Sequence, residues 1–205
     1  ISRVIGSGGF SVTYQAADLL LGGTVAVKEF FPRSCAERSW PEPEVMTRGG
    51  ENHKRFQDGL IHFREEASLT ASFQGRHNIV NVIDFCEENG TAYLVMEFLD
   101  GLTLEDFLRS LPGGRIEDPE DARQIAGAVA ESLEYIHKQG VIHRDISPNN
   151  VFLGTNGSVT LIDFGAARRT GRREETPVVV KTGYTPPEQY QKNGKQGVWT
   201  DLYAW

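Results

Sequence analysis

The pattern of apolar residues changes near Gly101, and this change constrains the fold more than any other feature of the sequence. Before it, β-branched and aromatic residues lie between glycines in "SRVIGSGGFSVTYQAADL" and "GGTVAVKEFF", which is typical of strands. Two more apolar runs flank Asn89-Gly90, a dipeptide that strongly predicts a hairpin. After Gly101 helical spacing dominates. We therefore expect an α+β fold with a strand-rich first part and a helix-rich second part.

The main helix of the first part is predicted by apolar residues three or four positions apart. Between residues 52 and 73 such residues fall on one face, and they are Phe56, Leu60, Phe63 and Ala67. The stretch before this helix, residues 32–51, contains prolines and paired glycines. It is therefore expected to be an irregular insert.

In the second part, capping residues indicate where helices begin and end. Thr103 is the expected N-cap of a short helix in "LTLEDFLRSL". Asp118 and Pro119 begin a long helix, and Gly140 ends it. Short strands are expected at "VIH", "VFL" and "VTLI", so the polar segment "RDISPNN" should form a loop between two of them.

Composition excludes several classes of function. The chain has 205 residues and a formal net charge of −7, which argues against non-specific nucleic-acid binding. Cys35 and Cys86 form no CxxC, so neither a disulfide framework nor a zinc site is expected, and a cytoplasmic location fits. No apolar run reaches membrane-spanning length. The chain opens at Ile1 and stops at "DLYAW" within a pattern, so we interpret it as a fragment that is unstable or inactive alone.

Two features of the first part indicate phosphate chemistry. The glycines of "GSGGF" would let backbone N–H groups approach a phosphate, although a tight turn alone also explains them. Lys28 lies among apolar neighbours in a predicted strand, where an unpaired amine is costly. Its amine either reaches water or is held against a carboxylate. Glu66 is the leading candidate for that carboxylate, and Glu65 is its rival.

Oxygen-bearing side chains follow the predicted strands of the second part. Asp145 is placed to accept a hydroxyl proton, Asn150 to bind a metal ion through its amide oxygen, and Asp163 to provide a second metal contact. A single aspartate in a loop is usually a turn or cap residue, but such groups at adjacent strand ends are much less expected by chance. Mg²⁺ prefers oxygen ligands of these kinds.

Taken in order, "GSGGFS", "AVK", "HRDISPNN", "IDFG" and "PPE" resemble the signature motifs of protein kinases. The segments "GGFSVTY", "KEFFP" and "GYTPPEQY" are most similar to bacterial serine/threonine kinases, and the resemblance covers the whole chain. It implies a bilobal, protein-kinase-like α+β fold that is truncated at its C-terminal end. Residues 1–97 would form the N-lobe with the insert 32–51, residues 98–101 the hinge, and residues 102–205 an incomplete C-lobe.

The resemblance also implies roles for single residues. The implied ATP-binding positions are Gly6, Gly8, Gly9, Ala26, Lys28, Glu97, Leu99 and Phe152. Lys28 would pair with Glu66, and Asp145 would accept the proton of the substrate hydroxyl. The implied ligands of Mg²⁺, or of Mn²⁺, are Asn150 and Asp163. The implied regulatory positions in and near the activation segment are Arg144, Thr170 and Thr176. Asp201 would brace the backbone of the His143-Arg144 turn.

Ser147 departs from the family pattern. Eukaryotic serine/threonine kinases carry a lysine at this position, which contacts the transferring phosphate and a threonine of the substrate-binding loop. Counting back from Glu188 places Lys181 at that threonine position. We hypothesise that Lys181 supplies the missing cation and is catalytic. The alternative is that Lys181 is a solvated loop lysine and Ser147 a neutral replacement.

The implied function is an ATP-dependent protein serine/threonine kinase that also phosphorylates itself. Protein substrates are the expected partners, and dimerisation for autophosphorylation is left open, as is a membrane anchor in the full-length protein. One alternative is a pseudokinase scaffold that binds nucleotide, against which the intact set of Lys28, Glu66, Asp145, Asn150 and Asp163 argues. The other is a small-molecule kinase of the aminoglycoside or choline type, against which Arg144 and "PPEQY" argue.

Overall fold

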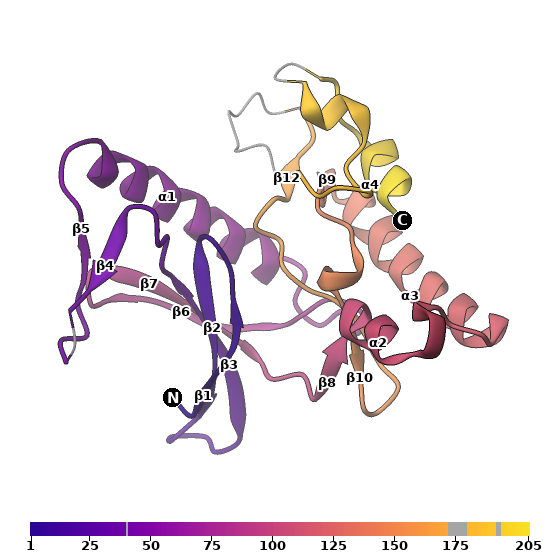
Figure 1. Cartoon of the computed structure of the whole chain (residues 1–205), viewed down its shortest axis with the longest axis horizontal. Coiled ribbons are helices and arrows are strands. Elements are labelled where there is room, and N and C mark those ends of the chain that lie inside the picture. The colour runs from indigo at the N-terminus through magenta and orange to yellow at the C-terminus, as the bar shows by residue number, and fades with distance from the viewer. Residues whose placement is uncertain (40, 172–179, 192–193) are drawn as a thin grey trace. The chain divides into compact units, whose positions relative to one another are not determined.

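The computed structural model describes residues 1–39, 41–171, 180–191 and 194–205 (Figure 1). These residues form two compact units. Unit 1 comprises Ile1–Gln74 and Asn81–Leu99, and unit 2 comprises Gly75–Val80 and Asp100–Trp205. Strands dominate unit 1 and helices dominate unit 2, as the change of pattern in the sequence predicts.

Unit 1 is built on an antiparallel sheet with the strand order β1-β2-β3-β7-β6. The strands are β1 Arg3–Ser7, β2 Ser11–Ala17, β3 Thr24–Phe30, β6 Val82–Glu88 and β7 Thr91–Glu97. The predicted Asn89-Gly90 turn joins β6 to β7, and both residues have positive φ (53° and 69°), as tight hairpin turns of this kind require. In the middle of the sheet, Lys28 lies between Thr13 and Leu94.

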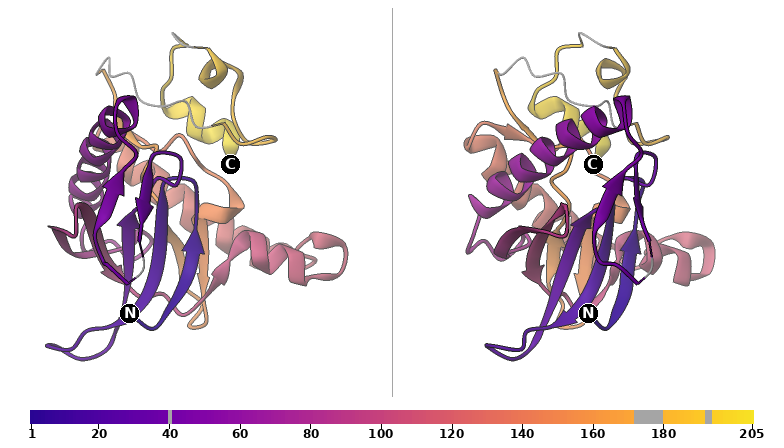
Figure 2. Two further views of the ribbon diagram at one scale, coloured as in Figure 1. Left: turned by 60° about the vertical axis from the view of Figure 1, so that its left-hand side comes forward. Right: turned by 90° about the vertical axis from the view of Figure 1, so that its left-hand side faces the viewer.

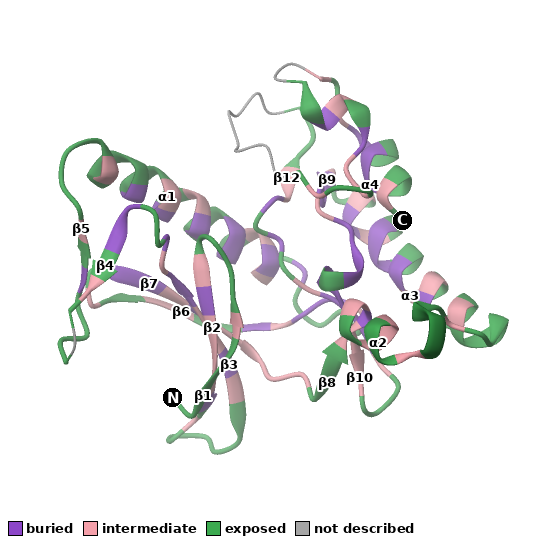
Figure 3. Cartoon of the chain, viewed as in Figure 1, coloured by how far each residue is buried: buried purple, intermediate pink, exposed green. Residues whose placement is uncertain are grey.

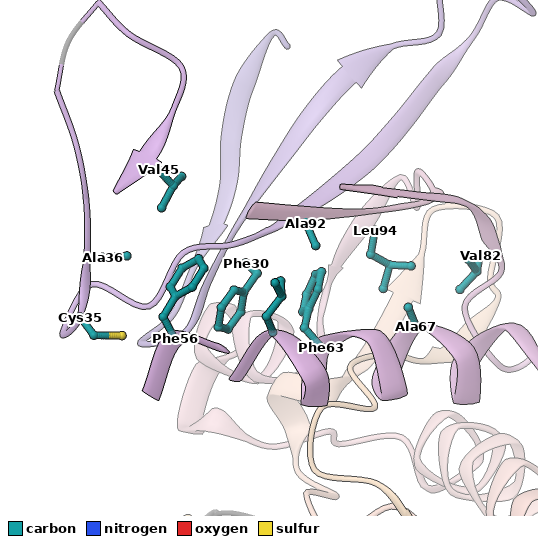
Figure 4. Packing of buried hydrophobic residues seen from close by; sticks show 11 residues of the cluster. Phe30, Cys35, Ala36, Val45, Phe56, Phe63, Ala67, Val82, Ala92 and Leu94 are labelled. Atoms are coloured by element: carbon teal, nitrogen blue, oxygen red, sulfur yellow. The ribbon is translucent and has the colours of Figure 1, made fainter. Parts of the chain in front are cut away.

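Helix α1, residues Glu51–Ala71, packs along one face of this sheet (Figure 2). Its predicted apolar face is buried, with Phe56, Leu60, Phe63 and Ala67 among the core residues. Figure 4 shows Phe56 and Phe63 on either side of Phe30, whose ring centroid lies 5.1 Å from that of Phe56. A Cβ atom on Gly59 would fall 2.7 Å from Phe30 Cζ, so the close approach of helix and sheet depends on this glycine.

The insert corrects one prediction, because residues 32–51 are not irregular throughout. They contain a hairpin of β4 (Ala36–Arg38) and β5 (Val45–Thr47). Cys35, Ala36 and Val45 of this insert belong to the same buried cluster as the aromatic residues of α1 (Figure 4). Strands of three residues are too short to show a period, and their packing partners are distant in sequence.

A buried carboxylate ties the insert to the sheet. Glu29, next to Lys28 on β3, is 1% exposed and forms an ion pair with Arg38 of β4. The Tyr14 hydroxyl donates to Glu29 Oε2 at 2.8 Å, and burial together with this carboxylate raises the pKa of Tyr14. Arg38 also donates from Nε to the carbonyl of Pro43 at 2.8 Å, which closes the hairpin. Glu29 is therefore compensated by a cation that the insert supplies.

Replacing Arg38 with alanine is expected to lower the free energy of unfolding by about 2 kcal/mol, because Glu29 would stay buried without its cation. Urea unfolding measures the change. Arg55→Ala is the matched control, since Arg55 and its partner Glu51 on α1 are both exposed. If Arg38→Ala cost no more than Arg55→Ala, the hydrogen bond from Tyr14 alone would satisfy Glu29.

The helices of unit 2 begin at the predicted caps. Thr103 Oγ1 accepts from the Asp106 N–H at 3.1 Å at the start of α2 (Leu104–Ser110). Asp118 Oδ1 accepts from the Glu120 N–H at 2.8 Å at the start of α3 (Pro119–Lys138), so both predicted N-caps are confirmed. Gly140, with φ of 70°, follows the end of α3. Figure 3 shows the buried side of α3, formed by Ile125, Val129, Ser132, Leu133 and Ile136.

Short strands in unit 2 position its loops. The predicted strands are β9 Val141–Ile142, β10 Val151–Gly154 and β11 Val159–Leu161. Two more strands, β8 Gly101–Thr103 and β12 Arg168–Arg169, are too short to predict from a pattern. The sheets have the orders β11-β10-β8 and β12-β9. The remaining elements are η1 Pro112–Gly114, η2 Pro148–Asn150, η3 Pro187–Tyr190 and α4 Val198–Ala204. Among the described residues, no helix combines the length and the hydropathy that a membrane span needs.

Residues 75–80 follow α1 in sequence but belong to unit 2, which differs from the expected division at one hinge. The Leu161 N–H donates to the Asn78 carbonyl at 2.8 Å, and the Val80 N–H donates to the Leu161 carbonyl at 3.1 Å. Ser132 of α3 also donates its hydroxyl to the Asn78 carbonyl at 3.0 Å. The segment is therefore fixed by β11 and α3.

Candidate active site

The Lys28 amine of unit 1 is paired with a carboxylate. Its Nζ donates to Glu66 Oε1 at 2.6 Å, and the two side chains are only 12% and 9% exposed. Glu65, the rival in the sequence, is exposed and lies 3.3 Å from His62 Nδ1. Thr70, one turn further along α1, donates its hydroxyl to the Glu66 carbonyl at 2.8 Å. The structure therefore brings Lys28 to Glu66 and not to Glu65.

Neither Gly6, near the end of β1, nor Gly8 and Gly9, in the turn that leads to β2, need to be glycine for the turn to form. The Gly8 N–H donates to the Ser11 carbonyl at 2.9 Å. A Cβ atom on Gly8 would have its nearest neighbour at 4.0 Å, and one on Gly9 would meet nothing within 4 Å. On Gly6 it would meet only Thr13, at 3.6 Å. Neither a left-handed backbone conformation nor crowding demands glycine at these positions.

The predicted adenine positions of unit 1 lie on β3 and at the end of β7. Ala26 is buried and pairs with Met96 across the sheet. The Glu97 N–H donates to the Asn81 carbonyl at 3.0 Å, and Glu97 Oε1 accepts from the Asn81 side chain at 2.9 Å. Leu99, two residues after the end of β7, is partly exposed. Phe152, the predicted position in unit 2, lies on β10 and is also partly exposed.

In unit 2 the loop between β9 and β10 brings Asp145 and Asn150 together. Asn150 Nδ2 donates to Asp145 Oδ2 at 2.7 Å and to the Asp145 carbonyl, also at 2.7 Å. Asn150 is buried, whereas the Asp145 side chain is 15% exposed. Because both bonds use the amide nitrogen, the amide oxygen of Asn150 is the atom left to bind a cation.

Asp201 of α4 holds the turn that precedes Asp145. Its fully buried carboxylate accepts from the His143 N–H at 2.8 Å and from the Arg144 N–H at 2.7 Å, so the expected bracing is confirmed. Arg144 has a φ of 69°, a conformation that residues with a side chain rarely adopt. The two hydrogen bonds therefore stabilise a backbone shape that is unfavourable on its own.

Asp163 follows a residue that is hydrogen-bonded to the same loop. The Ile162 N–H donates to the Asn150 carbonyl at 2.9 Å, which joins the loop to the residue before Asp163. Asp163 is exposed, has a φ of 61° and accepts from the Gly165 N–H at 3.1 Å. Phe164, by contrast, is buried against His143, with ring centroids 4.8 Å apart. The buried phenylalanine anchors a segment whose carboxylate faces solvent.

Lys181 also reaches this loop. Its Nζ donates to Ser147 Oγ at 2.8 Å and lies 3.3 Å from Asp145 Oδ1. Unit 2 therefore gathers a carboxylate, an amide oxygen and an ammonium around one loop, with a second carboxylate on the adjoining strand end. Carboxylate and amide oxygens suit a hard divalent cation, and the ammonium suits an anion such as phosphate.

Residues 1–205 match the family described as "Protein kinase domain". The chain belongs to the protein kinase family. Membership in the family implies the use of ATP and a divalent metal ion. It also explains why lysine–glutamate and aspartate–asparagine arrangements occur in the same chain, since phosphoryl transfer relies on positioning and charge neutralisation.

Bacterial relatives match this kinase chain over its whole length. A probable serine/threonine-protein kinase of Streptomyces coelicolor is 34% identical over 100% of this chain and 28% of the relative. PrkC, a serine/threonine-protein kinase of Bacillus subtilis, is 30% identical with the same coverage. The kinase chain thus spans 28% of the length of these curated relatives. The solved structure described as "PpkA-294 apo form" is 37% identical, with a TM-score of 0.84 over 98% of this chain and 70% of that chain. The expected protein-kinase-like fold is confirmed.

Arg144, a predicted regulatory residue of this kinase chain, is buried at 5% exposure. Its Nη1 donates to the Ala166 carbonyl at 3.2 Å. Burial, and then the neighbouring Arg168, lower the pKa of Arg144 to about 10, while Asp201 acts in the opposite direction. Arg144 is therefore still a cation at neutral pH, in a position where a second cation already lies close.

Thr170, one of the two predicted regulatory threonines, is hydrogen-bonded to the turn that follows α3. The Thr170 N–H donates to the Gly140 carbonyl at 2.7 Å, and its hydroxyl donates to the same carbonyl at 3.1 Å. Thr170 is exposed, so its hydroxyl is near the surface at the end of β12. Thr176 lies outside the described residues, as does the end of the basic run that begins at Arg168.

Two residues that support the catalytic loop were not singled out from the sequence. Gln189 is fully buried and donates from Nε2 to the Arg144 carbonyl at 2.8 Å. His137 of α3 contacts Asp201 Oδ2 at 2.8 Å through Nε2. The available signal for Gln189 was its place in "PPEQY". For His137 there was none, because its partner is 64 positions away.

Proposed function

We propose that this chain is the catalytic domain of an ATP-dependent protein serine/threonine kinase. The observation that carries the proposal is the pair of hydrogen bonds from the Asn150 amide to Asp145. This arrangement keeps Asp145 as an acceptor and reserves the Asn150 oxygen for a cation. A nucleotide-binding scaffold would have no use for it.

Unit 1 supplies groups for the nucleotide in this proposal. Lys28, oriented by Glu66, would neutralise the α/β-phosphates, and the backbone at Gly6, Gly8 and Gly9 would cover them. Ala26 would pack on the adenine ring. The Glu97 N–H is already used by Asn81, so its carbonyl and the backbone of Leu99 would bind the adenine edge. Phe152, on β10, remains a further predicted ATP-binding position.

The donor set fits a divalent metal ion, and we propose Mg²⁺, with Mn²⁺ as a substitute. Asn150 and Asp163 would hold it through hard oxygen atoms. Among the described residues, no three His, Cys, Asp or Glu side chains gather as a metal site, so the remaining ligands would come from phosphate and water. When bound, the ion supplies positive charge to the phosphate oxygens.

The reaction follows from the positions of the loop residues. The hydroxyl oxygen of a substrate serine or threonine would attack the γ-phosphorus of ATP, and the bond to the β–γ bridging oxygen would break to release ADP. Asp145 would orient the hydroxyl and accept its proton. Asn150 fixes the orientation of Asp145 through its amide, and Asp201 fixes the turn before it. These residues mainly position groups and balance charge.

Transfer of label from γ-³²P-ATP and Mg²⁺ tests the function directly, with a generic basic protein as substrate and the kinase itself as a second acceptor. We expect labelled phosphoserine and phosphothreonine. Intact nucleotide binding without transfer would indicate a pseudokinase scaffold, and transfer only to small alcohols or amines would indicate a small-molecule kinase. Either outcome would overturn the proposal.

Autophosphorylation between two copies would link activity to dimerisation, and it is part of this proposal. Arg144 and Thr170 are the described candidates for control by phosphorylation. Because the reaction consumes ATP, we propose that the domain works in the cytoplasm. A rate of self-labelling that rises with protein concentration is the signature expected of transfer between copies.

Replacing Glu66 with glutamine is expected to lower kcat/KM for ATP by about tenfold, equivalent to about 1.4 kcal/mol. Glutamine has the same shape but removes the charge that pairs with Lys28. Steady-state assays at varied ATP measure the effect. Glu65→Gln is the control, since Glu65 is exposed and faces His62. Equal effects of the two changes would contradict the assignment.

A further inference from the structure

Both the backbone and the side-chain amine of Lys181 are hydrogen-bonded, unlike those of a solvated loop lysine. Its backbone N–H donates to Thr185 Oγ1 at 2.6 Å, and its carbonyl accepts from the N–H groups of Tyr184 and Thr185 at 3.1 and 3.0 Å. At the other end, Nζ donates to Ser147 Oγ at 2.8 Å. The turn formed by residues 181–185 therefore directs the side chain into the catalytic loop.

Ser147 provides a buried hydrogen-bond acceptor for this amine. It is 1% exposed, and its hydroxyl oxygen accepts the hydrogen bond from Lys181. Nζ lies 3.3 Å from Asp145 Oδ1 and 3.4 Å from Oδ2, so the ammonium is near both carboxylate oxygens. An ammonium has three N–H donors. At 30% exposure of the side chain, the amine can still reach a ligand from the solvent side.

We infer that Lys181 is a catalytic residue that contacts the transferring phosphate. The segment that begins at residue 180 therefore supplies a positive charge to the site. This inference rests on the proposed function. Nζ lies 3.3 Å from the carboxylate that would accept the hydroxyl proton, so it lies beside the group from which the attack on the phosphorus would begin. Charge placed there acts where negative charge develops during transfer.

The contact between Lys181 and Ser147 also predicts that a lysine at position 147 could supply the cation in place of Lys181. The side chains at positions 147 and 181 touch, so a lysine at either position would place its amine beside Asp145. Exchanging the two residue types should therefore preserve the charge at this point, whereas removing the lysine should not. The loop that carries the lysine would matter less than where its amine lies.

The test compares Lys181→Ala, Lys181→Thr and the exchange Ser147→Lys/Lys181→Thr in the full-length protein. Lys138→Ala is the control, because Lys138 is exposed and pairs with Glu134 on α3. We expect Lys181→Ala to lower kcat about 50-fold and to raise KM for ATP by about tenfold, because the contact with the γ-phosphate is lost. The exchange should recover at least about tenfold over Lys181→Thr. Lys138→Ala should match the wild type.

A binding measurement decides the inference without turnover. A nonhydrolysable ATP analogue and ADP, each with Mg²⁺, are titrated into the wild type and Lys181→Ala, and melting temperatures are recorded. Contact with the γ-phosphate predicts that the preference for the triphosphate falls about tenfold while the melting temperature is unchanged. An unchanged preference, a kcat within threefold of the wild type, or no recovery by the exchange would overturn the inference. If the wild type transferred no phosphate, the proposed function would fail while the nucleotide preference would still judge Lys181.

Discussion

Asp145→Asn is expected to lower kcat by about a thousandfold, because an amide cannot accept the hydroxyl proton and does not carry the charge that pairs with Lys181. The asparagine oxygen can still accept the hydrogen bond from Asn150, so the loop should keep its shape. KM for ATP and the melting temperature should therefore change little. Initial rates with a peptide substrate, together with calorimetry, measure the two effects separately.

The control for this change is Asp121→Asn, an exposed aspartate in the first turn of α3 that should leave kcat unaltered. An Asp145→Asn protein with more than a tenth of the wild-type rate would rule out Asp145 as the proton acceptor. A protein that also melts far below the wild type would show that the change disturbs folding, and Asp145→Glu would then separate shape from charge.

Asp201→Ala is expected to cause the largest loss of stability, about 4 kcal/mol in the free energy of unfolding. The change leaves the N–H groups of His143 and Arg144 and the ring of His137 without their acceptor in a buried place. Each unsatisfied buried donor costs about 1–3 kcal/mol. For a chain of this size the melting temperature should fall by roughly 10 °C. Urea unfolding and thermal scans measure both quantities.

Activity should fall together with stability in Asp201→Ala, since Arg144 is kept in its left-handed conformation by the same carboxylate. Asp201→Asn keeps one acceptor oxygen and should lie between the alanine variant and the wild type. Glu134→Ala, at an exposed glutamate of α3, is the control. If Asp201→Ala unfolded like Glu134→Ala, the buried hydrogen bonds would contribute far less than their number suggests.

The sequence allowed prediction of those features that depend on neighbouring residues. The helix predicted within residues 52–73 is observed at Glu51–Ala71, and the Asn89-Gly90 hairpin and the N-caps at Thr103 and Asp118 are in place. Each rests on a local pattern, either helical periodicity or a turn or cap that its own side chain favours. The spacing of Asp145, Asn150 and Asp163 is likewise visible in the sequence alone.

What could not be predicted depends on partners distant in sequence. The hairpin of the insert is stabilised by a core shared with α1 and by the ion pair between Arg38 and Glu29, and neither produces a periodic pattern. The choice between Glu65 and Glu66 was open until the position of α1 against β3 was known. The sequence offered Lys181 only as a position to consider, whereas its contacts with Ser147 and Asp145 depend on a turn more than thirty residues away.

The hydrogen bonds of residues 75–80 constrain the order in which this protein folds while it is being synthesised. The backbone groups of Asn78 and Val80 bond to Leu161, which leaves the ribosome about eighty residues later. At roughly 5–20 residues per second, the delay is about 4–16 seconds. All strands of the unit 1 sheet and α1 are made well before then, since the last of them ends at Glu97. Until Leu161 has been made, the Val80 N–H lacks its partner in the folded structure, and the site on β11 to which the segment bonds does not exist.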